Sequence, residues 1–202
     1  MEEFLRLPIL VISGFMPTRF DFIPTRLKGL TIVGRKPVED GRGLFERLFC
    51  ARELEEIGLQ RPIVQVNHSI TRKKGTVRGM HFQYPPHAET KIVTCMKGEV
   101  FDVAVDIRAD SPTFLQWHAE ILSAENRKSL FIPEGFAHGF QTLTEDCQLL
   151  YFHTKSYASD AEGGLNAQDP LLGISWPRSI AEISDRDRGH PYLSKDFSGI
   201  TL

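Results

Sequence analysis

The chain has 202 residues, enough for one sizeable hydrophobic core and too few for two domains of ordinary size. Its 24 Lys and Arg residues against 26 Asp and Glu residues give a formal net charge of −2, which excludes the basic excess of a general nucleic-acid-binding protein. No stretch approaches the roughly 20 consecutive apolar residues of a membrane span, and the Met-Glu-Glu start lacks the basic character of a signal peptide. We therefore expect a soluble protein with no membrane or nucleic-acid partner.

The three cysteines are Cys50, Cys95 and Cys147. They are odd in number and widely spaced, and no two form a Cys-x-x-Cys pair. This pattern argues against a disulfide framework and against a structural zinc site. It favours a reducing cytoplasm as the location of the protein.

The first third of the chain predicts short elements. Residues 1–20 hold Pro and Gly around a short apolar run, so we expect an N-terminal extension or an added edge strand there, followed by a single domain over residues 21–202. Two short strands are predicted on either side of Lys28-Gly29, and the Gly-rich residues 38–43 predict a turn. Residues 50–58 predict a short surface helix that ends at Gly58.

Short strands dominate the rest of the chain, with turn signals between them. The predicted strands are residues 63–69, 77–83, 91–95, 99–107, 117–122, 129–132, 139–143 and 148–153. Short strands at such regular spacing predict an all-β antiparallel jelly-roll barrel. The last forty residues are rich in Gly, Pro, Asp and Ser, and we expect this loop-rich segment, which carries Trp176, to fold back over the mouth of a pocket.

The stretch from Gly75 to Gly98 departs most from ordinary globular sequence. It resembles the first motif of the cupin barrels, in which a His-x-His pair and a later Glu bind a metal. His81 holds the first position, but Gln83 replaces the second His and Lys91 replaces the Glu.

The second cupin motif, Pro-x-Gly-x-x-His, is present from Pro133 to His138. Of the four usual metal ligands only His81 and His138 therefore remain. An ammonium group at a ligand position repels a cation and offers no lone pair. The sequence predicts a cupin-like barrel that has no metal, with Lys91 as a fixed positive charge.

A more specific resemblance covers residues 22–187. The segments RGMHFQ, KGEVFDVAVDIR, LSAENRKSLFIPEGFAHGF, DPLLGISWP and ISDRD resemble the dTDP-4-dehydrorhamnose 3,5-epimerases, which are metal-free cupins that act on 4-keto-6-deoxy nucleotide sugars. The resemblance implies a jelly roll, no cofactor, and a homodimer in which an N-terminal strand reaches into the partner. It also implies a role in the biosynthesis of deoxysugars such as O-antigen precursors.

The resemblance also implies catalytic roles. The protons at C3 and C5 of a 4-keto sugar are acidic because their removal leaves an enolate on the C4 oxygen. His81 matches the base and Asp187 its partner, which holds the imidazole and stabilises its charge. Lys91 matches the group at the enolate oxygen. Tyr151 matches the acid that returns a proton from the other face.

Nine further residues match substrate-binding positions of the family: Arg42, Phe45, Gln65, Asn67, Arg78, His138, Tyr157, Glu162 and Arg186. Arg42 and Phe45 match residues that act across the dimer. On a regular strand Arg78 and His81 would face opposite sides, unless Gly79 allows a bulge. The remaining histidines, at positions 68, 87, 118, 153 and 190, are interpreted as structural or surface groups.

Three positions depart from the family pattern: Arg47 stands where Glu is expected, Val66 where Asp is expected, and Thr90 where Gly is expected. They surround the nucleotide rather than the carbonyl group, so the sequence leaves open the base, the sugar product, and whether C3 alone or both C3 and C5 are epimerised. A nucleotide-sugar 3,4-ketoisomerase and a non-catalytic sugar-binding cupin are the alternative functions. A metal-dependent cupin is disfavoured because its ligands would have to come from outside both motifs.

Overall fold

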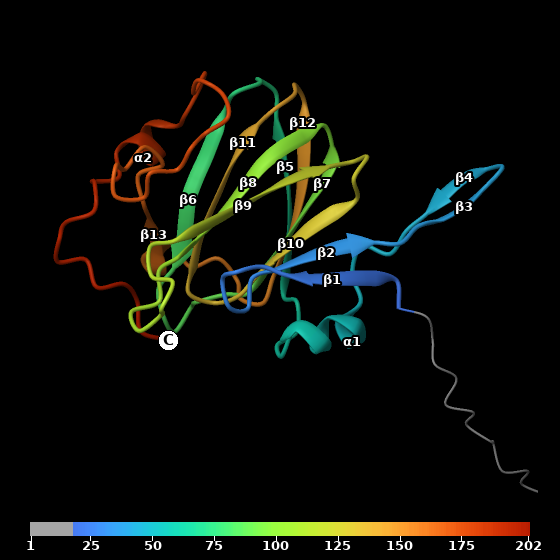
Figure 1. The fold of residues 1–202 in the computed structure, drawn as a ribbon, viewed down its shortest axis with the longest axis horizontal. Coiled ribbons are helices and arrows are strands. Elements are labelled where there is room, and N and C mark those ends of the chain that lie inside the picture. The colour runs from blue at the N-terminus through green and yellow to red at the C-terminus, as the bar shows by residue number, and fades with distance from the viewer. Residues whose placement is uncertain (1–17) are drawn as a thin grey trace, which may run out of the picture.

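The computed structural model describes residues 18–202, and its body consists of two antiparallel sheets that face each other (Figure 1). The six-stranded sheet has the order β1 (Phe20–Pro24), β2 (Thr31–Arg35), β10 (Lys128–Ile132), β7 (Lys91–Lys97), β12 (Cys147–His153) and β5 (Gln65–Thr71). The five-stranded sheet has the order β13 (Glu162–Gly164), β6 (Val77–Gln83), β11 (Phe136–Thr142), β8 (Glu99–Asp106) and β9 (Trp117–Ser123). The chain crosses repeatedly between the sheets, and the predicted all-β jelly roll is confirmed.

The alternation of side chains along β8 explains why both faces of the five-stranded sheet are apolar. Val100 and Ala104 point between the two sheets, where they join the central core. Val103 and Val105 point to the other face, which the C-terminal segment covers. A strand buried on both faces lacks the polar alternation of a half-exposed strand, which accounts for the apolar run of β8.

The C-terminal segment follows the outer face of the five-stranded sheet and then turns back toward the cavity. The Trp176 ring packs edge-on against Phe101 at 6.0 Å, and its indole N–H donates to the carbonyl oxygen of Ala167 over 2.7 Å. The short helix α2 (Asp185–Arg188) then brings its side chains to the edge of β6. We expected the C-terminal segment to lie at the mouth of a pocket. Helix α2 does so, whereas Trp176 packs on the outer face of the five-stranded sheet.

A short helical segment covers the outer face of the six-stranded sheet. It consists of α1 (Ala51–Leu54) and the 3-10 turn η1 (Glu55–Ile57), and it ends at Gly58, whose φ is 102°. This confirms the helix predicted from the sequence. Leu54 is buried among Phe20 and Phe152, so the segment seals the core on this side.

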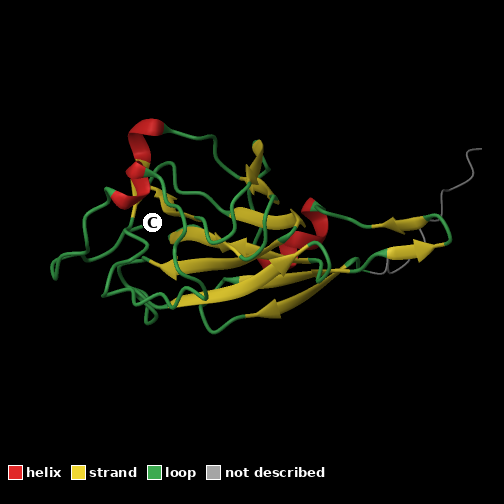
Figure 2. Ribbon diagram, turned by 90° about the horizontal axis from the view of Figure 1, so that it is seen from above, coloured by secondary structure: helices red, strands yellow, loops and turns green. Residues whose placement is uncertain are grey.

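A two-stranded hairpin extends away from the body of the molecule. It is formed by β3 (Val38–Asp40) and β4 (Gly43–Phe45), and Figures 1 and 2 show it at the far end of the molecule from α2. The sequence predicted only a turn here, because three-residue strands with few apolar side chains give little periodic signal.

The predicted N-terminal extension falls mainly on residues 1–17, which lie outside the described residues. Within the described part, Phe20 begins β1, which is an edge strand of the six-stranded sheet. The second 3-10 turn, η2 (Ser159–Ala161), precedes β13. Among residues 18–202, the helices are too short and too polar to cross a bilayer.

Candidate active site

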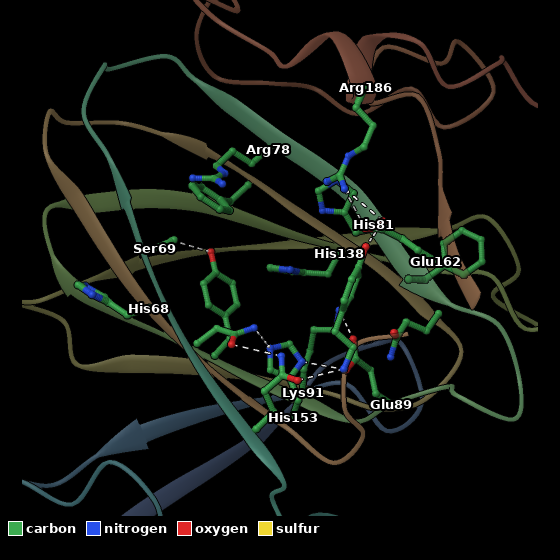
Figure 3. Close-up of a pocket in the computed structure, with 17 residues that line it drawn as sticks. His68, Ser69, Arg78, His81, Glu89, Lys91, His138, His153, Glu162 and Arg186 are labelled. Carbon is green, nitrogen blue, oxygen red and sulfur yellow. Dashed lines mark hydrogen bonds and ion pairs between the residues drawn. The ribbon is translucent and has the colours of Figure 1, made fainter. Parts of the chain in front are cut away.

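A cavity of about 410 Å³ opens between the two sheets (Figure 3). Ten of the thirteen site residues predicted from the sequence line it: Gln65, Asn67, Arg78, His81, Lys91, His138, Tyr151, Tyr157, Glu162 and Arg186. The walls come from different sheets, because His81 and His138 lie on β6 and β11 while Lys91 and Tyr151 lie on β7 and β12. A substrate in the cavity would therefore meet functional groups on both sides.

His81 and Asp187 form the predicted pair. The Nε2 atom of His81 lies 2.8 Å from Oδ1 of Asp187, and the other carboxylate oxygen accepts the backbone N–H of Gly79 over 3.0 Å. Ser184 caps α2 by accepting the backbone N–H of Asp187 over 3.1 Å, which fixes the carboxylate. The predicted contact between His81 and Asp187 is confirmed.

The charge state of Asp187 follows from these contacts. Burial opposes ionisation of the carboxyl group, but the hydrogen bonds from His81 and from the Gly79 amide outweigh it and hold the pKa of Asp187 well below its usual range. The carboxylate is therefore an anion at neutral pH. It can accept the Nε2 proton of His81, which leaves the lone pair on Nδ1.

Arg186 approaches the same nitrogen of His81. Its Nη2 atom lies 3.1 Å from His81 Nε2, and its Nη1 atom lies 3.1 Å from a carboxylate oxygen of Glu162. Nε2 has one proton or one lone pair, so it cannot donate to Asp187 and accept from Arg186 together. We favour the Asp187 bond because it is shorter and its carboxylate is buried. Arg186 then contributes positive charge near the ring.

A bulge at Gly79 explains how Arg78 and His81 share one face. His81 pairs with His138 and Arg78 pairs with Phe140, so two residues of β6 lie opposite one residue of β11. Gly79 has a φ of 118°, and a Cβ on it would lie 2.6 Å from the backbone of β11. The bulge therefore requires glycine, and the strand irregularity anticipated from the sequence is present.

Tyr151 lies on the opposite wall from His81. Its hydroxyl lies 3.1 Å from the hydroxyl of Ser69, and burial raises the pKa of Tyr151 well above its usual range despite that bond. The phenol therefore keeps its proton at neutral pH. Its ring lies edge-on to His138 at 6.3 Å, which shows that the two walls approach each other here.

Lys91 has partners that the sequence interpretation did not identify. Its Nζ atom lies 3.0 Å from Oε1 of Glu89, and the other oxygen of Glu89 lies 2.9 Å from Nδ1 of His153. Both partners line the cavity, and Figure 3 shows the three side chains together at one end of it. His153, interpreted from the sequence as a structural or surface group, lines the cavity, because the alternation of β12 places it on the same face as Tyr151. That period-2 spacing was the signal that could have found it.

His138 has a buried acidic partner of its own. Its Nε2 atom lies 2.9 and 3.0 Å from the two carboxylate oxygens of Asp102, which is fully buried on β8. His138 therefore has a hydrogen-bond partner inside the protein and also lines the cavity. Asp102 was missed because its neighbours on β8 gave only an apolar pattern.

The remaining predicted cavity residues form two connected groups. The hydroxyl of Tyr157 donates to Glu162 over 2.9 Å, and Glu162 also accepts from Arg186. Gln65 donates to the side-chain oxygen of Asn67 over 3.2 Å, and its own oxygen accepts the backbone N–H of Tyr157 over 3.0 Å. These contacts tie β5 to the loop that carries Tyr157.

Arg42 and Phe45 do not reach the cavity of their own chain. They lie on the β3–β4 hairpin, where Arg42 is held by Asp40 over 2.6 Å and Phe45 is 77% exposed. The hairpin points away from the cavity, so a role in binding requires a second copy, as the resemblance implied. Of the departures, Val66 faces away from the cavity between Gln65 and Asn67.

The residues at two of the cupin ligand positions, Gln83 and Lys91, form hydrogen bonds and ion pairs within the protein. The side-chain oxygen of Gln83 accepts the backbone N–H of Ala158 over 2.7 Å, and its amide donates to the carbonyl of His87 over 3.0 Å. Lys91 is paired with Glu89. Within residues 18–202, no three His, Cys, Asp or Glu side chains gather as a metal site would need.

Comparison with known proteins identifies the family. The family model described as dTDP-4-dehydrorhamnose 3,5-epimerase matches residues 24–195. The epimerase of Salmonella typhimurium is 46% identical over 175 residues, which cover 86% of this chain and 95% of that protein.

Solved structures agree. The dTDP-4-dehydrorhamnose 3,5-epimerase of Bacillus anthracis, with TDP and PPi bound, has a TM-score of 0.83 at 39% identity and covers 86% of this chain and 99% of its own. The dTDP-6-deoxy-D-glucose-3,5-epimerase of Legionella pneumophila, in complex with dTDP-4-keto-L-rhamnose, has a TM-score of 0.84 at 37% identity and covers 91% and 98%. Such likeness over most of both chains favours neither the ketoisomerase nor the sugar-binding alternative. The chain belongs to the dTDP-4-dehydrorhamnose 3,5-epimerase family.

Proposed function

We propose that the protein is a cofactor-independent isomerase that epimerises a 4-keto-6-deoxy nucleotide sugar of the dTDP-4-dehydro-6-deoxyglucose type, at C3 alone or at C3 and C5. The observation that carries this proposal is the arrangement of proton-transfer groups. A histidine held by a buried aspartate lies on one sheet, and a protonated tyrosine lies on the facing sheet of the same cavity. Inversion of a carbon centre needs a base on one face and an acid on the other.

His81 is the base in this mechanism. Asp187 accepts the Nε2 proton, so Nδ1 of His81 takes the proton from the carbon next to the ketone, and the buried carboxylate stabilises the imidazolium that forms. The electron pair left on carbon passes to the C4 oxygen as an enolate. The ammonium group of Lys91 stabilises that oxygen, where a preorganised charge lowers the barrier by several kcal/mol, roughly 3–4 for one donor.

Tyr151 is the acid. Because its phenol stays protonated at neutral pH, it can deliver a proton to the opposite face of the enolate, and the hydroxyl of Ser69 orients it. Return of the proton by His81 would only restore the starting configuration. Delivery from the facing sheet produces the epimer.

The nucleotide portion is bound by the polar and cationic groups of the cavity. Arg78 and Arg186 offer guanidinium groups to the diphosphate, and Tyr157 offers an exposed ring to the base. Thymidine is the proposed base, in line with the TDP and dTDP-sugar bound to the two relatives described above.

The working form is proposed to be a homodimer in the cytoplasm, making deoxysugars such as O-antigen precursors. The projecting hairpin supports the dimer, because its exposed Phe45 side chain could be buried against a second subunit. The three free cysteines, of which two are buried, support a reducing compartment.

The test is exchange of solvent deuterium, followed by NMR, with a panel of 4-keto nucleotide sugars that differ in base and sugar. Deuterium should enter C3, or C3 and C5, together with formation of the epimer. A protein that binds the sugars but exchanges neither position would contradict the proposal, and transfer of the proton to oxygen would point to a ketoisomerase.

A further inference from the structure

Glu89 and His153, which lie beside Lys91 at one end of the cavity, have no role in the mechanism above. Glu89 is 9% exposed at its side chain and uses its two oxygens separately, one for Nζ of Lys91 at 3.0 Å and one for Nδ1 of His153 at 2.9 Å. Few groups could replace it, because it must accept from both partners at once. A neutral amide offers one acceptor oxygen where the carboxylate offers two.

His153 is fixed at both ring nitrogens. Nδ1 donates to Glu89, and Nε2 lies 3.4 Å from the side-chain amide of Asn67, which can donate to it. This arrangement requires the neutral ring with its proton on Nδ1. An imidazole restrained in this way has a defined plane as well as a defined position.

The plane of His153 matters because Tyr151 packs against it. The two rings are stacked, with centroids 6.2 Å apart and planes 21° apart, since they lie two residues apart on the same face of β12. The Tyr151 ring also packs against the central core and lies edge-on to His138 at 6.3 Å, and its hydroxyl contacts Ser69. The stacked ring of His153 therefore restricts the direction in which the Tyr151 hydroxyl points.

We propose that Glu89 and His153 are positioning residues of the reaction: Glu89 fixes the ammonium group of Lys91 and the ring of His153 together, and His153 holds Tyr151 in line for proton delivery. The inference rests on the proposed function, because it assigns Lys91 to the enolate and Tyr151 to reprotonation. The buried carboxylate of Glu89 then positions both the group that stabilises the enolate and the group that returns the proton. Neither Glu89 nor His153 needs to touch the substrate.

The two residues should fail in different ways. Glu89→Gln releases both Lys91 and His153, so deuterium exchange and net epimerisation should both fall, by about tenfold or more for a loss of position of this kind. His153→Leu leaves the Lys91–Glu89 pair in place and removes only the ring that holds Tyr151. Exchange should then fall little, while net epimerisation falls at least about tenfold further than exchange.

A matched control exists elsewhere in the protein. Glu120 on β9 also lies beside a lysine and a histidine, with a hydrogen bond from Lys128 Nζ at 2.7 Å and His118 Nε2 within ion-pair range at 3.8 Å, and it is not among the residues that line the cavity. Glu120→Gln should leave exchange and epimerisation unchanged. Thermal melting of all three variants separates loss of fold from loss of position, and His153→Leu remains informative if Glu89→Gln fails to fold.

An NMR measurement that needs no turnover completes the test. In Glu89→Gln the ring signals of both His153 and Tyr151 should shift, whereas Glu120→Gln should move neither. A Tyr151 signal that stays in place, or equal loss of exchange and epimerisation in His153→Leu, overturns the positioning role. If the native protein exchanges no proton of any 4-keto sugar, the proposed function fails, and the ring signals still decide whether Glu89 and His153 hold Tyr151.

Discussion

In the proposed mechanism His81 removes the proton and Tyr151, on the facing wall of the cavity, returns one, so removal of the Tyr151 hydroxyl should separate the two steps. Tyr151→Phe keeps the base and removes the acid. Exchange of solvent deuterium with retained configuration should persist, while net epimerisation falls by roughly 10²–10⁴-fold, the contribution of a positioned acid. Both rates can be measured by NMR on one sample.

A packing role for the Tyr151 hydroxyl predicts a different result. Loss of its bond to Ser69 would then cost about 1 kcal/mol of the free energy of unfolding and leave both rates nearly intact. Equal loss of exchange and epimerisation would mean that Tyr151 positions the substrate instead.

Asp187→Asn should lower the rate of exchange by about 10²–10⁴-fold, because an amide can hold the wrong tautomer of His81 and cannot stabilise its charge. The same variant has a consequence for stability. Burial disfavours the carboxylate, yet the bonds from His81 and Gly79 lower the pKa of Asp187 in the folded protein, so ionised Asp187 stabilises the fold.

That contribution is present above the ordinary pKa of Asp, about 4, and is lost as the pH falls from there toward the lower pKa of the folded state. The native protein should therefore be more stable than Asp187→Asn at pH 7, and denaturation curves should show the difference shrinking below about pH 4. A difference that grows in acid would show that the carboxylate is not stabilised as described.

The bulge in β6 is the element that brings Arg78 and His81 to one face. Gly79→Ala should place a methyl group 2.6 Å from the backbone of β11 at a φ of 118°. We expect a loss of roughly 1–3 kcal/mol in the free energy of unfolding and a rate defect in the surviving folded protein. Gly41→Ala is the control, because its added Cβ meets nothing within 4 Å; equal effects of both would argue against the bulge.

The strands could be predicted from the sequence, because alternating apolar and polar residues and flanking turn residues mark each strand locally. The eight strands predicted between residues 63 and 153 all exist, with ends shifted by at most a few residues, as for β11, which begins at Phe136 rather than Gly139. The pairing of Glu89 with His153 could not be predicted, because it joins side chains across two strands and no local pattern encodes it. The contact of Asp187 with His81 came from family resemblance, not from spacing.

At the scale of the whole molecule, the position of the β3–β4 hairpin predicts that two subunits share each active site. If Arg42 of one copy completes the cavity of another, His81→Asn and Arg42→Ala should each be nearly inactive alone. Mixed and allowed to exchange subunits, they should form dimers in which one cavity has both residues, restoring about a quarter of the sites. Epimerisation assays before and after mixing measure this, and a mixture no more active than its parts would exclude the shared site.

The late position of helix α2 in the sequence has a consequence for folding during synthesis. All strands of both sheets are complete by Gly164, but Asp187 follows only near the end of the sequence. During synthesis the sheets can therefore form around a cavity that already holds His81 and Tyr151 while the histidine lacks its carboxylate. In the proposed mechanism full turnover has to wait until α2 has been synthesised, and a chain cut short after β13 would bring both walls together without the carboxylate that holds His81.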